Sequence, residues 1–124
     1  MDGAKQVQDF NRPCRDGSSS FDKIIPIIPN LLQAFPNTTF RATIYQYSCD
    51  KIYETYKFAE NMGFKNIFIC PNARETWTDN NLNKMHNEIH KIYADMILSF
   101  INNIKPISCA TINSTFKKIL EHDL

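Results

Sequence analysis

The chain has 124 residues, which is enough for one domain and too few for two of ordinary size. With 14 basic against 13 acidic side chains, the formal net charge of +1 provides no field that would steer a polyanion, so nucleic acid is not an expected partner. No window approaches the apolar length of a membrane span and no signal-peptide pattern opens the sequence, so we expect a cytoplasmic protein without a membrane partner.

The first two dozen residues combine polar, charged and small side chains before a helix begins. Asp2-Gly3 is typical of a strand end that turns into a loop, because glycine tolerates positive φ and close backbone approach. The charged residues that follow show no helical or strand period, and Gly17 to Ser20 then leads to a helix N-cap. Such a loop after a strand is where α/β proteins place their sites.

The rest of the chain alternates predicted helices and strands with short connections. We expect a helix after Ser19 or Ser20, kinked at Pro29, then a strand over 38–45, a helix over 50–62 ended by Gly63, a strand over 65–70, a helix from Thr78 or Asp79 to about Ile101, a short strand over 104–110 and a last helix over 114–120. Strands joined by helical crossovers are parallel neighbours. The order therefore predicts a single α/β domain of parallel βα units over residues 1–124.

The opening residues carry a resemblance to a known family. The run Met1-Asp2-Gly3, followed by Asp9, Arg12, Gly17 and Ser20-Phe21, resembles the middle segment of radical S-adenosylmethionine (SAM) enzymes, most closely the branch that matures peptides and sulfatases. Phe40-Arg41-Ala42-Thr43 resembles a later strand of that barrel. The likeness covers roughly the first seventy residues. Ala4 stands where the family has proline, and Gln8 stands where it often has histidine.

The resemblance implies a fold and an activity. The chain would be the second half of a (β/α)6 partial TIM barrel, contributing the SAM-binding half of an enzyme that modifies a peptide or protein. Asp2, Gly3, Arg12 and Arg41 would be its cofactor-binding residues, with the Arg12 guanidinium on the carboxylate of SAM. The missing N-terminal half of the barrel would cover the open strand edge. The alternatives are a non-catalytic truncated α/β fragment and a small nucleotide- or protein-binding module.

Metal ligands are sparse in the sequence. The family's CxxxCxxC motif does not occur, so the ligands of a 4Fe-4S cluster would lie outside this chain. The four cysteines are far apart, and we expect them to be reduced thiols, although Cys70 would emerge at the catalytic end of its strand. His86 and His90 are one helical turn apart. Two ligands alone close no coordination shell, so we expect two polar side chains on the helix surface rather than a metal site.

Overall fold

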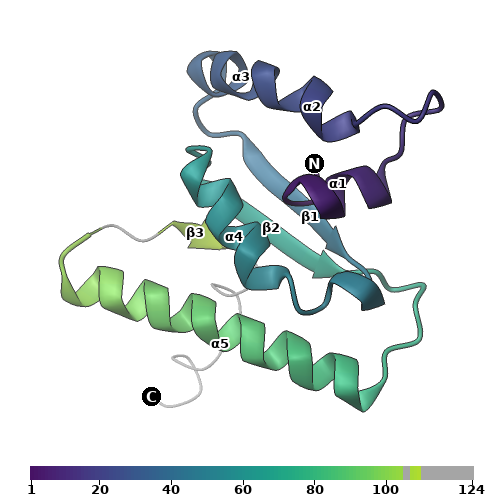
Figure 1. Cartoon of the computed structure of the whole chain (residues 1–124). Coiled ribbons are helices and arrows are strands. Elements are labelled where there is room, and N and C mark those ends of the chain that lie inside the picture. Colours follow the sequence, from purple (N-terminus) through teal and green to yellow (C-terminus); the bar gives the residue numbers. More distant parts are fainter. Residues whose placement is uncertain (105–106, 110–124) are drawn as a thin grey trace.

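A small parallel sheet organises the molecule. The computed structural model describes residues 1–104 and 107–109, and its three strands are β1 (Thr39–Ile44), β2 (Asn66–Pro71) and β3 (Ser108–Cys109). They lie side by side in the order β1-β2-β3, both pairs parallel, with Thr39 opposite Asn66 and Thr43 opposite Cys70. The prediction of an α/β chain with parallel neighbouring strands is therefore confirmed (Figure 1).

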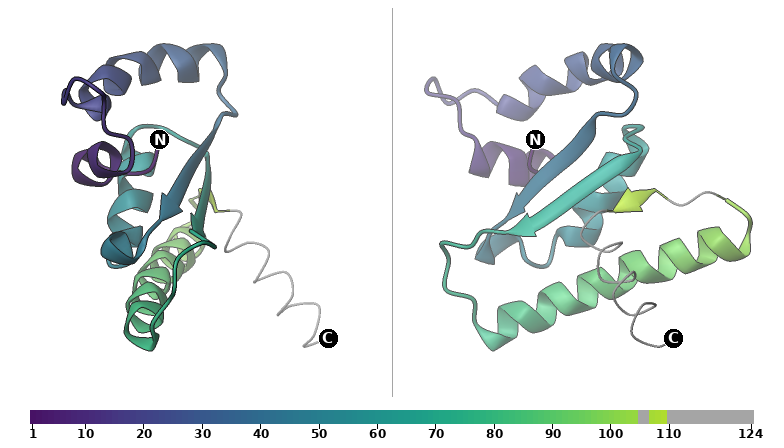
Figure 2. Two further views of the ribbon diagram at one scale, coloured as in Figure 1. Left: turned by 90° about the vertical axis from the view of Figure 1, so that its right-hand side faces the viewer. Right: turned by 180° about the vertical axis from the view of Figure 1, so that it is seen from behind.

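Both crossover helices pack on the same face of the sheet. Helix α4 (Ile52–Asn61) joins β1 to β2, and α5 (Asp79–Ile101) joins β2 to β3. Their apolar side chains enter one core with the inward-facing residues of the strands; the core is formed by Ile28, Phe40, Ala42, Ile44, Cys49, Ile52, Tyr56, Ala59, Phe64, Ile67, Ile69, Met85, Ile92 and Cys109. Figure 2 shows the described helices on this side of the sheet. Side chains alternate along a strand, so Arg41, Phe68 and Cys70 belong to the opposite face.

The two crossover helices are also joined to each other by polar contacts. Glu88 of α5 is only 7% exposed, and its carboxylate accepts a hydrogen bond of 3.1 Å from the backbone N–H of Tyr53, which is one of the orphan donors in the first turn of α4. The Tyr53 hydroxyl donates to Asp95 at 2.8 Å, and Lys57 approaches the same carboxylate at 3.3 Å. These contacts fix α4 against α5.

The first twenty residues contain a helix that the sequence did not predict. Helix α1 (Lys5–Asn11) is seven residues long and buries only Val7 and Gln8. One apolar buried position is too few to produce a recognisable period, which is why this segment reads as an irregular loop. Asp2 also belongs to no strand, contrary to the expectation that Asp2-Gly3 ends one.

Two prolines divide the next helical segment. Helix α2 (Ser20–Ile24) has Ser19 as its N-cap, whose hydroxyl accepts from the Asp22 N–H at 3.0 Å. A 3₁₀ turn, η1 (Ile25–Ile27), then leads to α3 (Ile28–Ala34), where Pro29 lies in the first turn. The helix was expected to run on and to kink at Pro29; instead it is interrupted before Pro29, by a tightened turn that contains Pro26. Because Pro29 starts a new helix, its missing N–H leaves no bond unmade.

The remaining elements match the sequence closely. A second 3₁₀ turn, η2 (Gln46–Ser48), connects β1 to α4, and Gly63 ends α4 with a φ of +91°. The Thr78 hydroxyl caps α5 by accepting from the Asn81 N–H at 3.2 Å. The predicted helix over 114–120 lies outside the described residues. No helix in the described part of the chain combines the length and apolar character needed to cross a bilayer.

Candidate functional site

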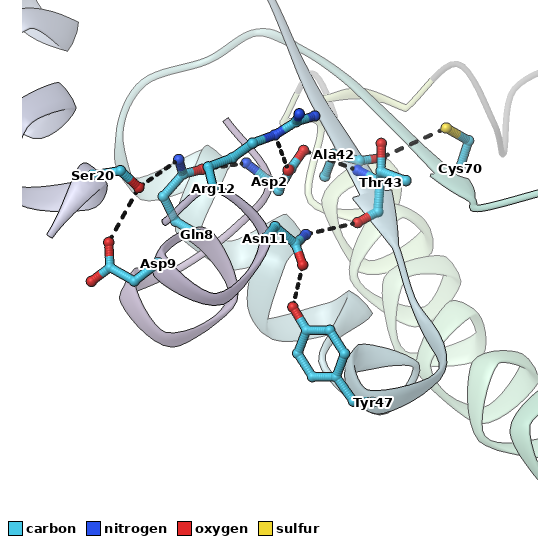
Figure 3. A network of polar contacts seen from close by, with 10 residues as sticks. All are labelled: Asp2, Gln8, Asp9, Asn11, Arg12, Ser20, Ala42, Thr43, Tyr47 and Cys70. Carbon is cyan, nitrogen blue, oxygen red and sulfur yellow. Dashed lines mark hydrogen bonds and ion pairs between the residues drawn. The ribbon is translucent and has the colours of Figure 1, made fainter. Parts of the chain in front are cut away.

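The carboxylate of Asp2 is the centre of a polar network at the carboxyl end of β1 (Figure 3). Asp2 is 3% exposed, and its Oδ1 accepts from the Thr43 N–H at 3.3 Å while its Oδ2 accepts from Arg12 Nε at 3.0 Å. Its own backbone N–H donates to Gln8 Oε1 at 2.8 Å. A buried carboxylate requires such partners, and here they come from β1 and from α1 with its C-cap.

Gln8 connects this centre to the following helix. Its side chain is 1% exposed, and besides accepting from Asp2 it donates through Nε2 to Ser20 Oγ at 3.1 Å. The amide thus uses both an acceptor and a donor, which neither a carboxylate nor an apolar side chain could do at that position. Gln8 therefore holds the Asp2 loop and α2 in one arrangement.

Asp9 fastens the start of α2. Its carboxylate accepts from the Phe21 N–H at 2.9 Å and from the hydroxyls of Ser19 and Ser20 at 2.7 and 3.3 Å. The bond from the Phe21 N–H, helped by those from the two serines, lowers the pKa of Asp9 below its ordinary value. Asp9 is thus a cap supplied to α2 from α1, and its oxygens are turned toward the protein.

Asn11 completes the contacts with β1. Its Nδ2 donates to the Thr43 carbonyl at 3.4 Å, and its Oδ1 accepts from the Tyr47 hydroxyl. Tyr47 also packs against Phe10, with ring centroids 4.1 Å apart, and burial raises the pKa of its phenol. Phe10 is 68% exposed, so an aromatic surface lies beside the network.

Arg12 has hydrogen-bonding capacity to spare. The Arg12 side chain is 62% exposed, and its contact with Asp2 uses Nε alone. A guanidinium has five N–H donors, so, as far as residues 1–104 and 107–109 are concerned, the two Nη groups remain for a ligand while Asp2 holds the side chain in place. The end-on pair of Nη groups matches the two oxygens of a carboxylate or a phosphate.

Gly3 packs against α4. With φ at +151° it adopts a conformation that other residues rarely take, and a Cβ built on it would lie 2.9 Å from Thr55 Oγ1 and 3.1 Å from Val7 Cβ. The need for glycine at this position therefore comes from the approach of the loop to α4. Among the described residues, the buried Thr55 hydroxyl has no hydrogen-bond partner.

Arg41 lies away from the Asp2 network. It is exposed on the sheet face opposite α4 and α5, with its guanidinium carbon 5.1 Å from the centre of the Phe68 ring. Cys70 belongs to the same face, and its thiol lies 3.8 Å from the Ala42 carbonyl. The structure thus brings Asp2, Gly3 and Arg12 together at the carboxyl end of β1, while Arg41 lies on the face of that strand opposite the two crossover helices.

The described residues do not fit an iron–sulfur cluster. Cys49 and Cys109 are buried, Cys14 and Cys70 are half-buried, and none is paired in a disulfide. Within residues 1–104 and 107–109, no three side chains of the histidine, cysteine or acidic type converge on one point. A cluster would therefore need ligands from elsewhere.

Sequence reasoning passed over three residues that build this network: Gln8, Asn11 and Tyr47. Gln8 stood out only as a departure from the family pattern, and the other two are polar or aromatic residues of ordinary appearance. Their roles depend on α1, which was not predicted. Polar residues three apart, as at 8 and 11, are the one signal that a short helix presents them on neighbouring positions.

In comparisons with known proteins, neither a family model nor a curated protein matches this chain.

Proposed function

We propose that this chain is part of a radical SAM enzyme that modifies a peptide or protein, and that it contributes the SAM-binding half of the barrel. The observation that carries the proposal is the Asp2–Arg12 pair at the carboxyl end of β1, which holds an exposed guanidinium whose two Nη groups bind no other residue of the described part of the chain. Ligands of α/β proteins bind at the carboxyl ends of parallel strands.

The winding of the sheet supports a partial TIM barrel. Strand order β1-β2-β3 follows chain order, and α4 and α5 pack on one face. Successive crossovers on one face are the winding of a barrel, whereas doubly wound sheets have helices on both faces. On this proposal the face that bears Arg41, Phe68 and Cys70 is the barrel interior, and the missing N-terminal half of the barrel pairs with the outer edge of β1.

Four of the described residues would take part in binding SAM on this proposal. Arg12 would hold the methionyl carboxylate through its Nη groups, and Asp2 would orient Arg12 and balance its charge. Gly3 would let the loop reach this position by packing on α4. Arg41 would extend the site onto the interior face. When bound beside a reduced cluster, SAM supplies a radical that abstracts a substrate hydrogen.

A SAM titration tests the proposal. Backbone amide resonances of the isotopically labelled chain are followed while SAM is added, for the wild type, Arg12→Lys and Arg15→Lys. Shifts are expected around Asp2, Arg12 and Thr43. Arg12→Lys should weaken binding by about tenfold, because lysine keeps the charge but lacks the paired donors, a difference of roughly 1.4 kcal/mol. Arg15 is an exposed loop residue and its substitution should change little.

The titration also separates the alternatives. If ATP shifts the same resonances as SAM with equal affinity, the chain is a general nucleotide-binding module. If neither ligand shifts any resonance, or if Arg12→Lys and Arg15→Lys weaken binding alike, Arg12 is an ordinary loop charge and the assignment fails. A spectrum without dispersed resonances would indicate a truncated fragment that does not fold by itself.

A further inference from the structure

Two histidines project from the middle of α5. His86 and His90 are one turn apart, and both are exposed. Their neighbour Glu88 points to the other side of the helix, where it accepts from the Tyr53 N–H and pairs with Lys91. Lys91, which follows His90 in the chain, is thus engaged with Glu88. The two imidazoles form a separate feature of the helix surface.

The structure shows more than the sequence spacing implies. His86 Nε2 and His90 Nε2 are 2.9 Å apart, and the two rings are nearly perpendicular, with 79° between their planes. Without a metal, this distance is a hydrogen bond in which one neutral ring donates and the other accepts. Both nitrogens therefore point to the same small region in front of the helix.

The separation of the nitrogens also suits one kind of metal ion. With metal–nitrogen bonds of about 2.0–2.1 Å, two nitrogens 2.9 Å apart subtend roughly 90° at the ion. A tetrahedral ion would need its nitrogens about 3.3 Å apart at the same bond length. Cis angles of 90° belong to the square-planar and tetragonal sites of Cu²⁺ and Ni²⁺, ions for which imidazole is a favoured ligand.

We propose that His86 and His90 chelate one Ni²⁺ or Cu²⁺ ion through their two Nε2 atoms. Within the described residues no third ligand of the usual types converges there, so water fills the remaining coordination positions. Both rings bind in the neutral state with hydrogen on Nδ1. The ring that donated the hydrogen bond moves its proton from Nε2 to Nδ1 through solvent, and no net proton is released.

Nickel titration of the full chain tests the chelate. Ni²⁺ is the probe, because free thiols would reduce Cu²⁺. Calorimetry is performed on the wild type, His86→Ala, His90→Ala and His122→Ala, the last replacing the only other histidine of the sequence. We expect one Ni²⁺ per wild-type chain. Either His86→Ala or His90→Ala should weaken binding at least about tenfold, because the second nitrogen of a chelate acts at high effective concentration.

The melting temperature in the presence of Ni²⁺ is a second measurement, and it shows whether the ion binds to the folded helix. Ni²⁺ bridges two turns of the folded helix and has no such site in the unfolded chain, so it should raise the melting temperature of the wild type and of His122→Ala. It should not raise that of His86→Ala or His90→Ala. The proposal is overturned if the two single variants each keep wild-type affinity, if they merely halve the number of ions bound, or if His122→Ala abolishes binding.

Discussion

At the scale of single residues, the site is built from side chains that hold each other before they hold a ligand. The carboxylate oxygens of Asp2 accept hydrogen bonds from Thr43 and Arg12. The side-chain amide of Gln8 accepts from the Asp2 N–H and donates to Ser20. Such a network is stable only when every member is satisfied. It is also what leaves Arg12 with a fixed position and free donors.

Gly3 is the residue at which this arrangement is most sensitive to substitution. We expect Gly3→Ala to lower the free energy of unfolding by about 2–3 kcal/mol, because it combines an unfavourable φ with contacts of 2.9 and 3.1 Å to Thr55 and Val7. Gly17→Ala is the matched control. Gly17 also has positive φ, at +73°, but nothing lies within 4 Å of its added Cβ, so a loss of about 1 kcal/mol is expected. Urea unfolding measures both, and equal losses would contradict the packing argument.

At the scale of elements, α1 and α2 depend on each other through Asp9. Neither helix exceeds seven residues, which is too short for a helix to be stable alone in water. Asp9 satisfies the Phe21 N–H in the first turn of α2, where its charge also complements the helix dipole. The pair of helices is therefore held by a contact that contains a titratable group.

Acid should weaken this contact. Because the folded protein lowers the pKa of Asp9 below 3.8, the ionised carboxylate favours folding above that value, and its contribution is lost as the pH falls through the lowered pKa. Asp9→Asn should melt at a lower temperature than wild type at pH 7. The difference should shrink as the pH falls below 3.8. Thermal melts followed by circular dichroism check this, and a difference that is the same at every pH would show that the charge of Asp9 is not involved.

The elements that could be predicted from sequence are those whose apolar residues repeat regularly over a long stretch or whose ends carry a clear boundary signal. Helix α5 has a stripe of apolar residues over about five turns and a Thr78 cap, and β1 and β2 are β-branched or apolar runs between polar turns. Of the residues that form the site, only Asp2, Gly3 and Arg12 were predicted as cofactor-binding residues. Helix α1 is held in place by contacts of its own Gln8 and Asp9. Polar contacts between distant segments do not produce a repeating pattern in the sequence.

At the scale of the whole molecule, β1 is an edge strand in the described part of the chain. The Ile44 carbonyl accepts from the Asn72 N–H at 2.8 Å, so the backbone groups of Phe40, Ala42 and Ile44 face β2. By alternation, those of Thr39, Arg41 and Thr43 face outward. An open edge of this kind favours pairing with another strand.

Proline substitution along β1 tests which groups point outward. Arg41→Pro removes an N–H on the open edge, so the folded chain should retain most of its stability while losing the capacity to add a strand there. Ala42→Pro removes an N–H that faces β2 and should destabilise the chain by about 3 kcal/mol or more. Circular dichroism measures stability, and sedimentation velocity at increasing concentration measures self-association. Equal destabilisation by the two prolines would show that the alternation has been assigned incorrectly.

The side chains of Asp2 and Asn11 have one more consequence. Together they occupy the outward N–H and C=O of Thr43, the two groups that a neighbouring strand would otherwise bind. A strand added to β1 can therefore pair beside Thr39 and Arg41 but must stop before Thr43. The contacts of Asp2 and Asn11 with Thr43 thus limit how far an added strand can extend along β1, and so restrict its register. They select one alignment from those that an open edge allows, and they keep the incoming backbone from displacing the carboxylate that positions Arg12.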